Sequence, residues 1–384
     1  MAANKIIKNS NTTTILLVLA VLCVAGILYT RYNDKQDSLF SDLNFNDMIQ
    51  KYLAKDESSL ADDQKKKPIL WIPICYETNA RNWLSFGSRN TTELNQPYLY
   101  LTVKTIISRC NASFNICIID DDSFGKLLPS WSIDMSKISS PVSNKIRQLG
   151  MMKILHKYGG MIVPPSFLCM RDLTDLYSMG TSNGKMFVVE NNDRNSTSVN
   201  FEFYPDLSFC GAPKETAVVG ELIDFIQRTI SCDYTAESVF LGEFSRWINV
   251  RREKVNIIDG KLIGVKTMHD EPILVDNLLN NSYIDLYPQT YGIYIPSNEI
   301  LSRRKYEWFA RMSPRQVVES KVILGKYILL ANAPDAKQGV IEPLETLPNW
   351  VSYWRVPSGA PLWGLKPNDL GNHLIQEKHY DKNT

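Results

Sequence analysis

A shortage of histidine and of net charge limits the chemistry that this sequence supports. The 384 residues include four histidines, none at a spacing typical of metal ligands, and the formal net charge is +1 with no long basic run. Nucleic-acid phosphates are bound by clustered Lys and Arg, so we do not expect nucleic acid as a partner. A Walker loop is also absent from the sequence, which leaves NTPase chemistry unsupported.

The cysteines do not form any Cys-x-x-Cys pair, which argues against a zinc ribbon. One of the seven, Cys23, lies in an apolar N-terminal segment. The other six permit up to three disulfides, but their spacing does not specify a pairing. Buried free thiols in separate elements are an equally good interpretation. These six are Cys75, Cys110, Cys117, Cys169, Cys210 and Cys232.

The N-terminal segment carries no charged side chain from Asn9 to Thr30. A helix of that length spans roughly 30 Å of hydrocarbon at about 1.5 Å per residue. We predict a transmembrane anchor at 12–30 with residues 1–11 in the cytosol, because two lysines precede the span and the charges just after it cancel. A cleaved signal peptide is the alternative, although the apolar core exceeds the usual length.

Four Asn-x-Ser/Thr sequons that follow the span agree with a translocated body. We therefore expect a single-pass, type II membrane protein that faces the Golgi or ER lumen, or that sits in a viral or cell-surface membrane. The candidate N-glycosylation sites are Asn90, Asn111, Asn195 and Asn280.

Composition divides the rest of the chain into three parts. Residues 31–67 are polar and charged and read as a stem with one helix near Phe45 to Leu53. An α/β domain is expected at 68–335. Residues 336–384 are rich in Pro and Trp, including Trp350, Trp354 and Trp363, and are expected to pack on that domain.

Apolar runs alternate with amphipathic segments through this domain. The pattern predicts strands at 68–76, 114–122, 161–165 and 184–191, and helices at 98–110, 142–160 and 214–230. Such alternation favours an α/β fold with a mainly parallel, Rossmann-type sheet and flanking helices. Ligands bind at the carboxyl ends of strands in these sheets, where Asp120 to Asp122 and Pro164 to Ser166 fall.

One stretch, "SNKIRQLGMMKILHKYGGMIVPPSF", resembles the glycosyltransferase family with a DXD sugar-binding motif. That family is typified by yeast Golgi mannosyltransferases and bacterial capsular polysaccharide synthesis proteins. The resemblance covers about residues 68–230 and extends more faintly to about 330. The residues in register with the family pattern are Ser143, Arg147, Leu149, Leu155, Tyr158, Gly159 and Gly160.

The resemblance implies a GT-A fold that binds a nucleotide-sugar. In such a site two carboxylates hold Mn²⁺ or Mg²⁺, which neutralises the diphosphate, and an arginine makes charge-assisted hydrogen bonds near the donor. By resemblance, the donor-binding candidates are Arg147, Asn144, Gly159, Gly160, Asp120, Asp121 and Asp122.

The sequence departs from the family pattern at its acidic positions. Pro164-Pro165-Ser166 stands where the family has Asp-x-Asp, and Asn144 stands where it has another Asp. A shifted alignment does not restore them, because no Asp or Glu occurs between Asp134 and Asp172. Mn²⁺ or Mg²⁺ is therefore expected only if Asp120, Asp121 or Asp122 substitutes, and a solvated N-capping turn is the simpler interpretation of those three.

Other polar residues have simpler interpretations. Glu190 and Asp193 read as loop charges, and the segment from His269 to Glu271 as a surface stretch. Lys145, Lys153 and Lys157 form a basic helix face that is normally solvated. The late tryptophans read as packing residues rather than a sugar-stacking platform.

Two hypotheses follow from these observations. The first is a membrane-anchored glycosyltransferase-like protein that transfers sugar from a nucleotide-sugar to a glycan or protein acceptor by a metal-independent route. The second is a pseudo-glycosyltransferase that serves as a membrane-anchored binding or structural component, including a virion component.

Overall fold

The computed structural model describes residues 23–24, 26, 42–53, 67–76, 93–138, 142–192, 202–232 and 237–332. The chain divides into two compact units, Met1–Lys51 and Tyr52–Thr384. The described part of the first unit consists mainly of helix α2, Asp42–Tyr52, close to the helix expected in the stem. Within the described residues, no helix has the length and apolarity needed to cross a bilayer. The predicted span at 12–30 lies almost wholly outside those residues and stays a prediction.

The second unit is built on a six-stranded sheet with strand order β2-β1-β3-β6-β5-β7. Its parallel pairs are β1 with β2, β1 with β3 and β5 with β7, whereas β6 runs antiparallel to both β3 and β5. The prediction of an α/β fold with a mainly parallel sheet is therefore confirmed. The strands are β1 Ile69–Pro73, β2 Asn115–Ile119, β3 Gly160–Ile162, β5 Met186–Asn191, β6 Tyr204–Ala212 and β7 Val255–Ile258.

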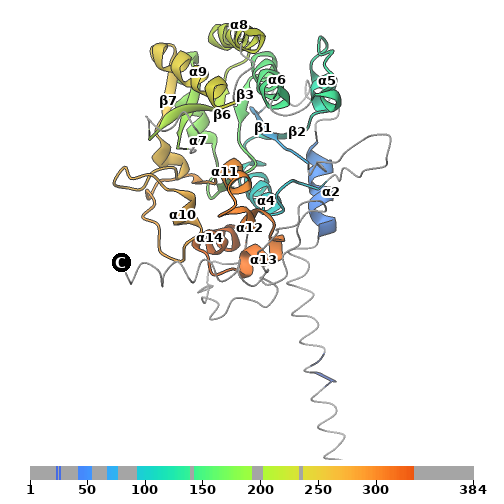
Figure 1. Cartoon of the computed structure of the whole chain (residues 1–384), viewed down its shortest axis with the longest axis vertical. Helices are drawn as coiled ribbons and strands as arrows, with labels where there is room; N and C mark the ends of the chain where they lie inside the picture. Colours follow the sequence, from blue (N-terminus) through green and yellow to red (C-terminus); the bar gives the residue numbers. More distant parts are fainter. Residues whose placement is uncertain are drawn as a thin grey trace, which may run out of the picture. The chain divides into compact units, whose positions relative to one another are not determined.

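A separate antiparallel pair joins β4, Phe167–Cys169, to β8, Gly292–Tyr294. Helices flank the six-stranded sheet, and α6 and α8 pack against each other (Figure 1). The helices of this unit are α4 Leu99–Cys110, α5 Ser123–Leu127, α6 Val142–Tyr158, α7 Thr174–Gly180, α8 Ala217–Cys232, α9 Glu237–Val250, α10 Val275–Leu278, α11 Ser297–Ser302, α12 Glu307–Ala310, α13 Pro314–Glu319 and α14 Ile323–Asn332. Short 3-10 turns cover Met135–Lys137, Ser182–Gly184 and Gly260–Ile263.

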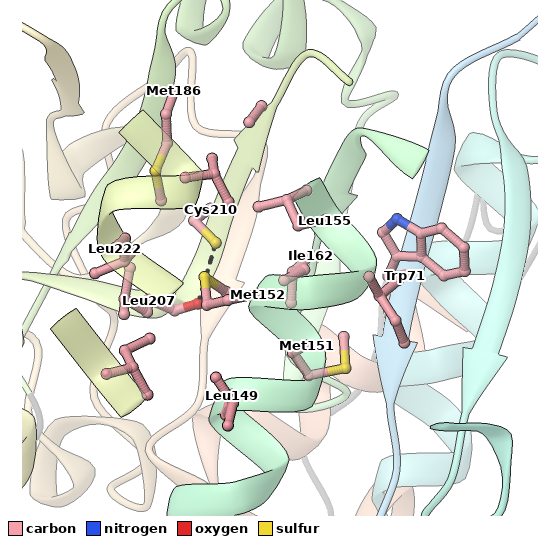
Figure 2. Packing of buried hydrophobic residues seen from close by; sticks show 14 of the residues in the cluster. Trp71, Leu149, Met151, Met152, Leu155, Ile162, Met186, Leu207, Cys210 and Leu222 are labelled. Carbon is pink, nitrogen blue, oxygen red and sulfur yellow. Dashed lines mark hydrogen bonds between the residues drawn. The ribbon is translucent and has the colours of Figure 1, made fainter. Parts of the chain in front are cut away.

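One face of the sheet packs against α5, α6, α8 and α9 to form an apolar core cluster. Alternate strand residues such as Trp71, Ile162 and Cys210 point to this face, as expected from the two-residue period of a strand (Figure 2). Leu155 of α6 and Leu222 of α8 meet them there. The buried strands explain why the sequence shows continuous apolar runs at β1 and β2.

Two glycines at the start of β3 allow a close approach between backbone segments. Gly159 and Gly160 have φ values of 71° and 99°, a region that favours glycine. A Cβ on Gly160 would lie 2.2 Å from the Ile69 carbonyl oxygen, and a Cβ on Gly159 would lie 2.7 Å from the Lys214 backbone nitrogen. The Trp71 indole Nε1 donates a hydrogen bond of 2.8 Å to the Gly159 carbonyl. These contacts fix where β3 enters the sheet beside β1.

The sequence did not predict three of the strands, which are β4, β6 and β7. β6 was missed although its residues alternate between half-buried and buried positions from Tyr204 to Phe209. Pro205 and Asp206 at its start are unusual strand residues, which hid that alternation. The short strands β4 and β7 have three and four residues, too few for a period to be visible.

We predict that Gly160→Ala destabilises the second unit strongly, because the substitution combines a left-handed backbone with a clash against backbone. The left-handed conformation alone costs about 1–2 kcal/mol for a residue with a Cβ. Gly125→Ala in α5 is the matched control, since nothing lies within 4 Å of its added Cβ. Thermal unfolding should show a lowered midpoint for Gly160→Ala and an unchanged or higher one for Gly125→Ala. Equal midpoints would contradict the close approach.

Candidate functional site

The order β2-β1-β3 places a topological switch point between β1 and β3. The chain moves from β1 to β2 on one side and then returns to β3 on the other side of β1. In open α/β sheets, ligands bind outside the carboxyl ends of the strands at such a point. The residues beyond Pro73, Ile119 and Ile162 therefore form the candidate site.

An arginine and an aspartate form the central contact of this site. Arg147 Nε and Nη2 donate to Asp121 Oδ1 and Oδ2, each at 2.7 Å, in a bidentate ion pair. Arg147 Nη1 also donates to Asn144 Oδ1 at 2.8 Å. The Arg147 and Asp121 side chains are 31% and 35% exposed, so solvent screens the pair and its contribution to stability is on the order of 1 kcal/mol or less.

The local fold explains why these residues meet. Asp121 follows the end of β2, and helix α6 runs back from the same edge of the sheet before β3 begins. Asn144 and Arg147 are three residues apart near the start of α6, so they share one face of the helix. The amino end of this 17-residue helix also carries a partial positive charge.

Asp120 caps the turn into α5. Its Oδ1 accepts hydrogen bonds from the Ser123 backbone nitrogen at 2.9 Å and from Ser123 Oγ at 2.7 Å. The Tyr76 hydroxyl donates to Asp120 Oδ2 at 3.3 Å. Burial, and next the charge of Asp120, raise the pKa of Tyr76 above its ordinary value, so the phenol keeps its proton and remains a donor. Asp120 therefore makes the capping contact expected from the sequence, but it is buried rather than solvated, and Asp122 makes no capping bond.

The tip of β3 is closed by packing. Pro164 is buried and the Ser166 residue is only 1% exposed. Thr102 of α4 donates from Oγ1 to the Pro165 carbonyl at 2.5 Å, and the Ser166 carbonyl accepts from the Ile295 nitrogen at 3.2 Å. The positions that carry carboxylates in the resembled family thus hold buried residues that offer no charged ligand.

The carboxylates present do not fit a divalent metal as they stand. Arg147 engages both oxygens of Asp121, Ser123 and Tyr76 engage Asp120, and Asp122 is exposed beyond them. In the part of the chain that the structure describes, no cluster of three or more His, Cys, Asp or Glu residues is placed to hold a metal ion. The residues at this edge of the sheet therefore do not fit a Mn²⁺ or Mg²⁺ site.

The glycines assigned to donor binding lie elsewhere. Gly159 and Gly160 form the amino end of β3, whereas Asp121, Arg147 and Asn144 lie at the carboxyl edge of the sheet. The structure brings the acidic and basic candidates together and separates the glycines from them. The contacts of the two glycines are with the backbone of Ile69 and Lys214, which is a packing role.

A second polar cluster occupies the same edge of the sheet at the end of β5. β5 is parallel to β3, since both are antiparallel to β6. Glu190 Oε2 accepts from the Gly260 nitrogen at 3.2 Å and from Lys266 Nζ, and Asp259 lies 3.5 Å from the same Nζ. Desolvation opposes the charge of Lys266, but the hydrogen bond and charge of Glu190 raise its pKa overall.

Glu190 is therefore a strand residue in a partly buried ion pair rather than a loop charge, which corrects the expectation from sequence. Nearby, Asn191 Nδ2 donates to Asp206 Oδ2 at 2.9 Å and to the Tyr294 hydroxyl at 3.3 Å. Sequence reasoning missed Asp206 because β6 was not predicted, and it missed Tyr294 because the contact with Asn191 joins residues 103 positions apart in the chain.

The remaining candidates have diverse surroundings. Lys145 is only 3% exposed, so the expectation of a solvated position was wrong, while Lys153 and Lys157 are half-buried. His269 is exposed, and its Nε2 lies 3.3 Å from Asp285 Oδ2.

Two of the candidate glycosylation sites, Asn111 and Asn280, are exposed, as glycosylation requires. The other predicted residues, Asn90, Asp193, Asn195, Trp350, Trp354 and Trp363, lie outside the described residues.

Gly180 to Gly184 match the Gly-x-Ser-x-Gly pattern of serine hydrolases. In a nucleophile elbow this pattern joins a strand to a following helix. Here it joins helix α7 to strand β5, and Ser182 lies in an exposed 3-10 turn. The pattern therefore lacks the context that hydrolase chemistry needs.

Comparisons of the chain with models of known protein families, with curated proteins and with solved structures give no match.

We predict different effects for two neighbouring aspartates. Asp120→Ala should lower stability by about 1–3 kcal/mol, because the buried Ser123 nitrogen and the Tyr76 hydroxyl lose their acceptor. Asp122→Ala should change stability by less than about 0.5 kcal/mol, because its side chain is exposed and makes no capping bond. Chemical denaturation monitored by tryptophan fluorescence measures both. Equal losses would contradict the capping role of Asp120.

A second stability prediction concerns the β5 cluster. Glu190→Gln should destabilise the protein by about 1–3 kcal/mol, because it removes the main anionic partner of a lysine that is largely buried. Lys266→Met keeps a similar volume and removes the buried charge, so its effect should be smaller. The same denaturation measurement ranks the two variants. A larger loss for Lys266→Met would show that the pair itself is strongly stabilising.

Proposed function

We propose that this chain is a membrane-anchored, GT-A-like protein that binds a nucleotide-sugar at the carboxyl edge of β1, β2 and β3. On this proposal it transfers the sugar to a glycan or protein acceptor without a metal. The observation that carries the proposal is the meeting of Asp121, Arg147 and Asn144 at the β1/β3 switch point. The anchor at 12–30 and a type II orientation belong to the same proposal.

The charges at this edge define how an anionic donor would bind. A sugar diphosphate requires cationic or N–H donors. Arg147 supplies a guanidinium, and the amino end of α6 supplies a partial positive charge. Asp121 balances the charge of Arg147 in the absence of ligand, so the diphosphate would compete with Asp121 for the guanidinium.

Asp121, once displaced, would have a second use. A carboxylate at the end of a strand is well suited to accept hydrogen bonds from ribose hydroxyls. Asp122 is exposed beside it and offers another acceptor. The pair Asp121–Arg147 would therefore change partners on binding, with the arginine turning to phosphate and the aspartate to sugar hydroxyls.

A second candidate function is a pseudo-glycosyltransferase that binds but does not transfer. It is favoured by the β3 tip, where Pro164 and Ser166 are buried and supply no carboxylate. In the resembled family this position holds the metal that stabilises the leaving diphosphate. Binding at Arg147 without that stabilisation would leave a membrane-anchored binding component.

Binding and turnover separate these functions. We expect UDP-glucose or GDP-mannose to raise the thermal midpoint of the detergent-solubilised full chain, to an equal extent with and without Mn²⁺. Arg147→Gln should weaken this binding at least about tenfold, because a charge-assisted bidentate contact is lost. Arg315→Gln is the matched control, since it breaks an exposed ion pair with Glu319 on α13.

Release of nucleoside diphosphate distinguishes the two candidates. Release in the presence of a glycan acceptor supports transfer, whereas binding without release supports the pseudoenzyme. The absence of a shift with every donor tested would contradict both. A shift that requires Mn²⁺ would contradict the metal-independent route.

A further inference from the structure

Two buried cysteines from different elements lie against each other in the second unit. Cys110 is the last residue of α4, and Cys169 is the last residue of β4. Both are fully buried, and their Sγ atoms are 3.9 Å apart. All seven cysteines are free thiols in the structure. The remaining cysteines beyond the predicted span lie in other elements: Cys75 after β1, Cys117 in β2, Cys210 in β6 and Cys232 in α8.

Regular secondary structure holds both cysteines in place. Helix α4 packs along β4, and the Cys169 backbone nitrogen donates to Thr105 Oγ1 of α4 at 3.0 Å. Thr105 Oγ1 in turn donates to the Thr102 carbonyl at 2.7 Å. On its other side, Cys169 pairs with Gly292 of β8. The approach of the two sulfurs is therefore a property of packed elements and not of a loop.

We propose that Cys110 and Cys169 form an intramolecular disulfide when the chain folds under oxidising conditions. A disulfide has sulfurs about 2.05 Å apart, so the two Sγ atoms must approach by roughly 2 Å. Rotation about the two Cα–Cβ bonds moves a sulfur through distances of that order while the backbone stays in place. This cross-link is independent of the proposed nucleotide-sugar binding.

The oxidation is balanced with a disulfide such as oxidised glutathione as the oxidant. The thiolate of one cysteine attacks oxidised glutathione, forms a mixed disulfide and releases one glutathione thiolate. The second cysteine thiolate then attacks the protein sulfur of that mixed disulfide and releases the second glutathione. Two electrons and two protons pass from the cysteine pair to give two molecules of reduced glutathione.

Burial determines when this reaction takes place. Desolvation, and next the hydrogen bond with Cys110, raise the pKa of Cys169 well above its ordinary value. The thiolate needed for exchange is therefore scarce in the folded, reduced protein. The bond should form during folding, while the thiols are accessible, and should then resist reduction until the protein unfolds.

The position of the cross-link relates it to the candidate site. The loop between Cys110 and Cys169 contains β2, α5, α6 and β3, and with them Asp121 and Arg147. A disulfide that closes a loop of this length restricts the unfolded chain and stabilises the folded state. The cross-link would thus tie together the ends of the segment that carries the candidate site.

Peptide mapping after refolding tests the proposal. The full chain is unfolded, reduced and refolded in detergent with a reduced/oxidised glutathione buffer, and the remaining thiols are then alkylated under denaturing conditions. Trypsin is expected to release residues 110–126 and 158–171, which carry Cys110 and Cys169. We expect these two peptides to be joined and to separate on reduction.

Three alanine variants identify the sulfurs. The peptide 110–126 also contains Cys117, so Cys117→Ala should keep the cross-link while Cys110→Ala and Cys169→Ala abolish it. Refolding with a reductant in place of the glutathione buffer should lower the thermal midpoint of the wild type and of Cys117→Ala by at least about 5 °C. The midpoint of Cys110→Ala should not respond to reduction. Alkylation of both cysteines in the refolded protein, or a link through Cys117, would overturn the proposal.

Discussion

The backbone of β3 passes Ile69 of β1 at a distance that only glycine permits, and the position of the candidate site depends on that contact. Gly160 lacks the Cβ that would lie 2.2 Å from the Ile69 carbonyl oxygen. Because β3 enters the sheet there, β1 has β2 on one side and β3 on the other. That arrangement creates the switch point at which Asp121 and Arg147 meet. The two glycines thus act through the sheet, from its opposite end.

The carboxyl edge of the sheet carries two ion pairs that differ in burial. At the β1/β3 switch point, the Asp121–Arg147 pair is partly exposed and stabilises the fold little, so its members are able to change partners. At the end of β5, Glu190 and Lys266 are more deeply buried, and exchange of their partners would expose a desolvated charge. An anionic ligand is therefore easier to accommodate at the first region than at the second.

Much of the first half of the domain could be predicted from the sequence, because its strands are buried on both faces and the long helix α6 ends at a Gly-Gly turn. Those patterns predicted β1, β2, β3 and α6, and the rule for ligand sites in parallel sheets then pointed to Asp121, whereas Arg147 was a candidate only through the family resemblance. The capping contact of Asp120 could also be predicted, because aspartate is a preferred capping residue in a turn that follows a strand.

The rest depended on long-range contacts that have no local pattern. β6 inserts between β3 and β5 in the antiparallel direction, and Pro205 and Asp206 obscured its alternation. Without β6, the contact of Asn191 with Asp206 was not visible, and the contact of Glu190 with Lys266 joins residues that are 76 positions apart in the chain. Likewise, the sequence spacing of Cys110 and Cys169 does not reveal that α4 packs along β4.

Hydrogen–deuterium exchange of the full chain with and without a nucleotide-sugar tests the central claim most directly. If the β1/β3 switch point is the ligand site, UDP-glucose or GDP-mannose should slow exchange at residues 73–76, 119–123 and 143–148. Exchange at the end of β5 and in α13 should stay unchanged. Protection confined to the β5 cluster, or no protection in any segment, would contradict the account.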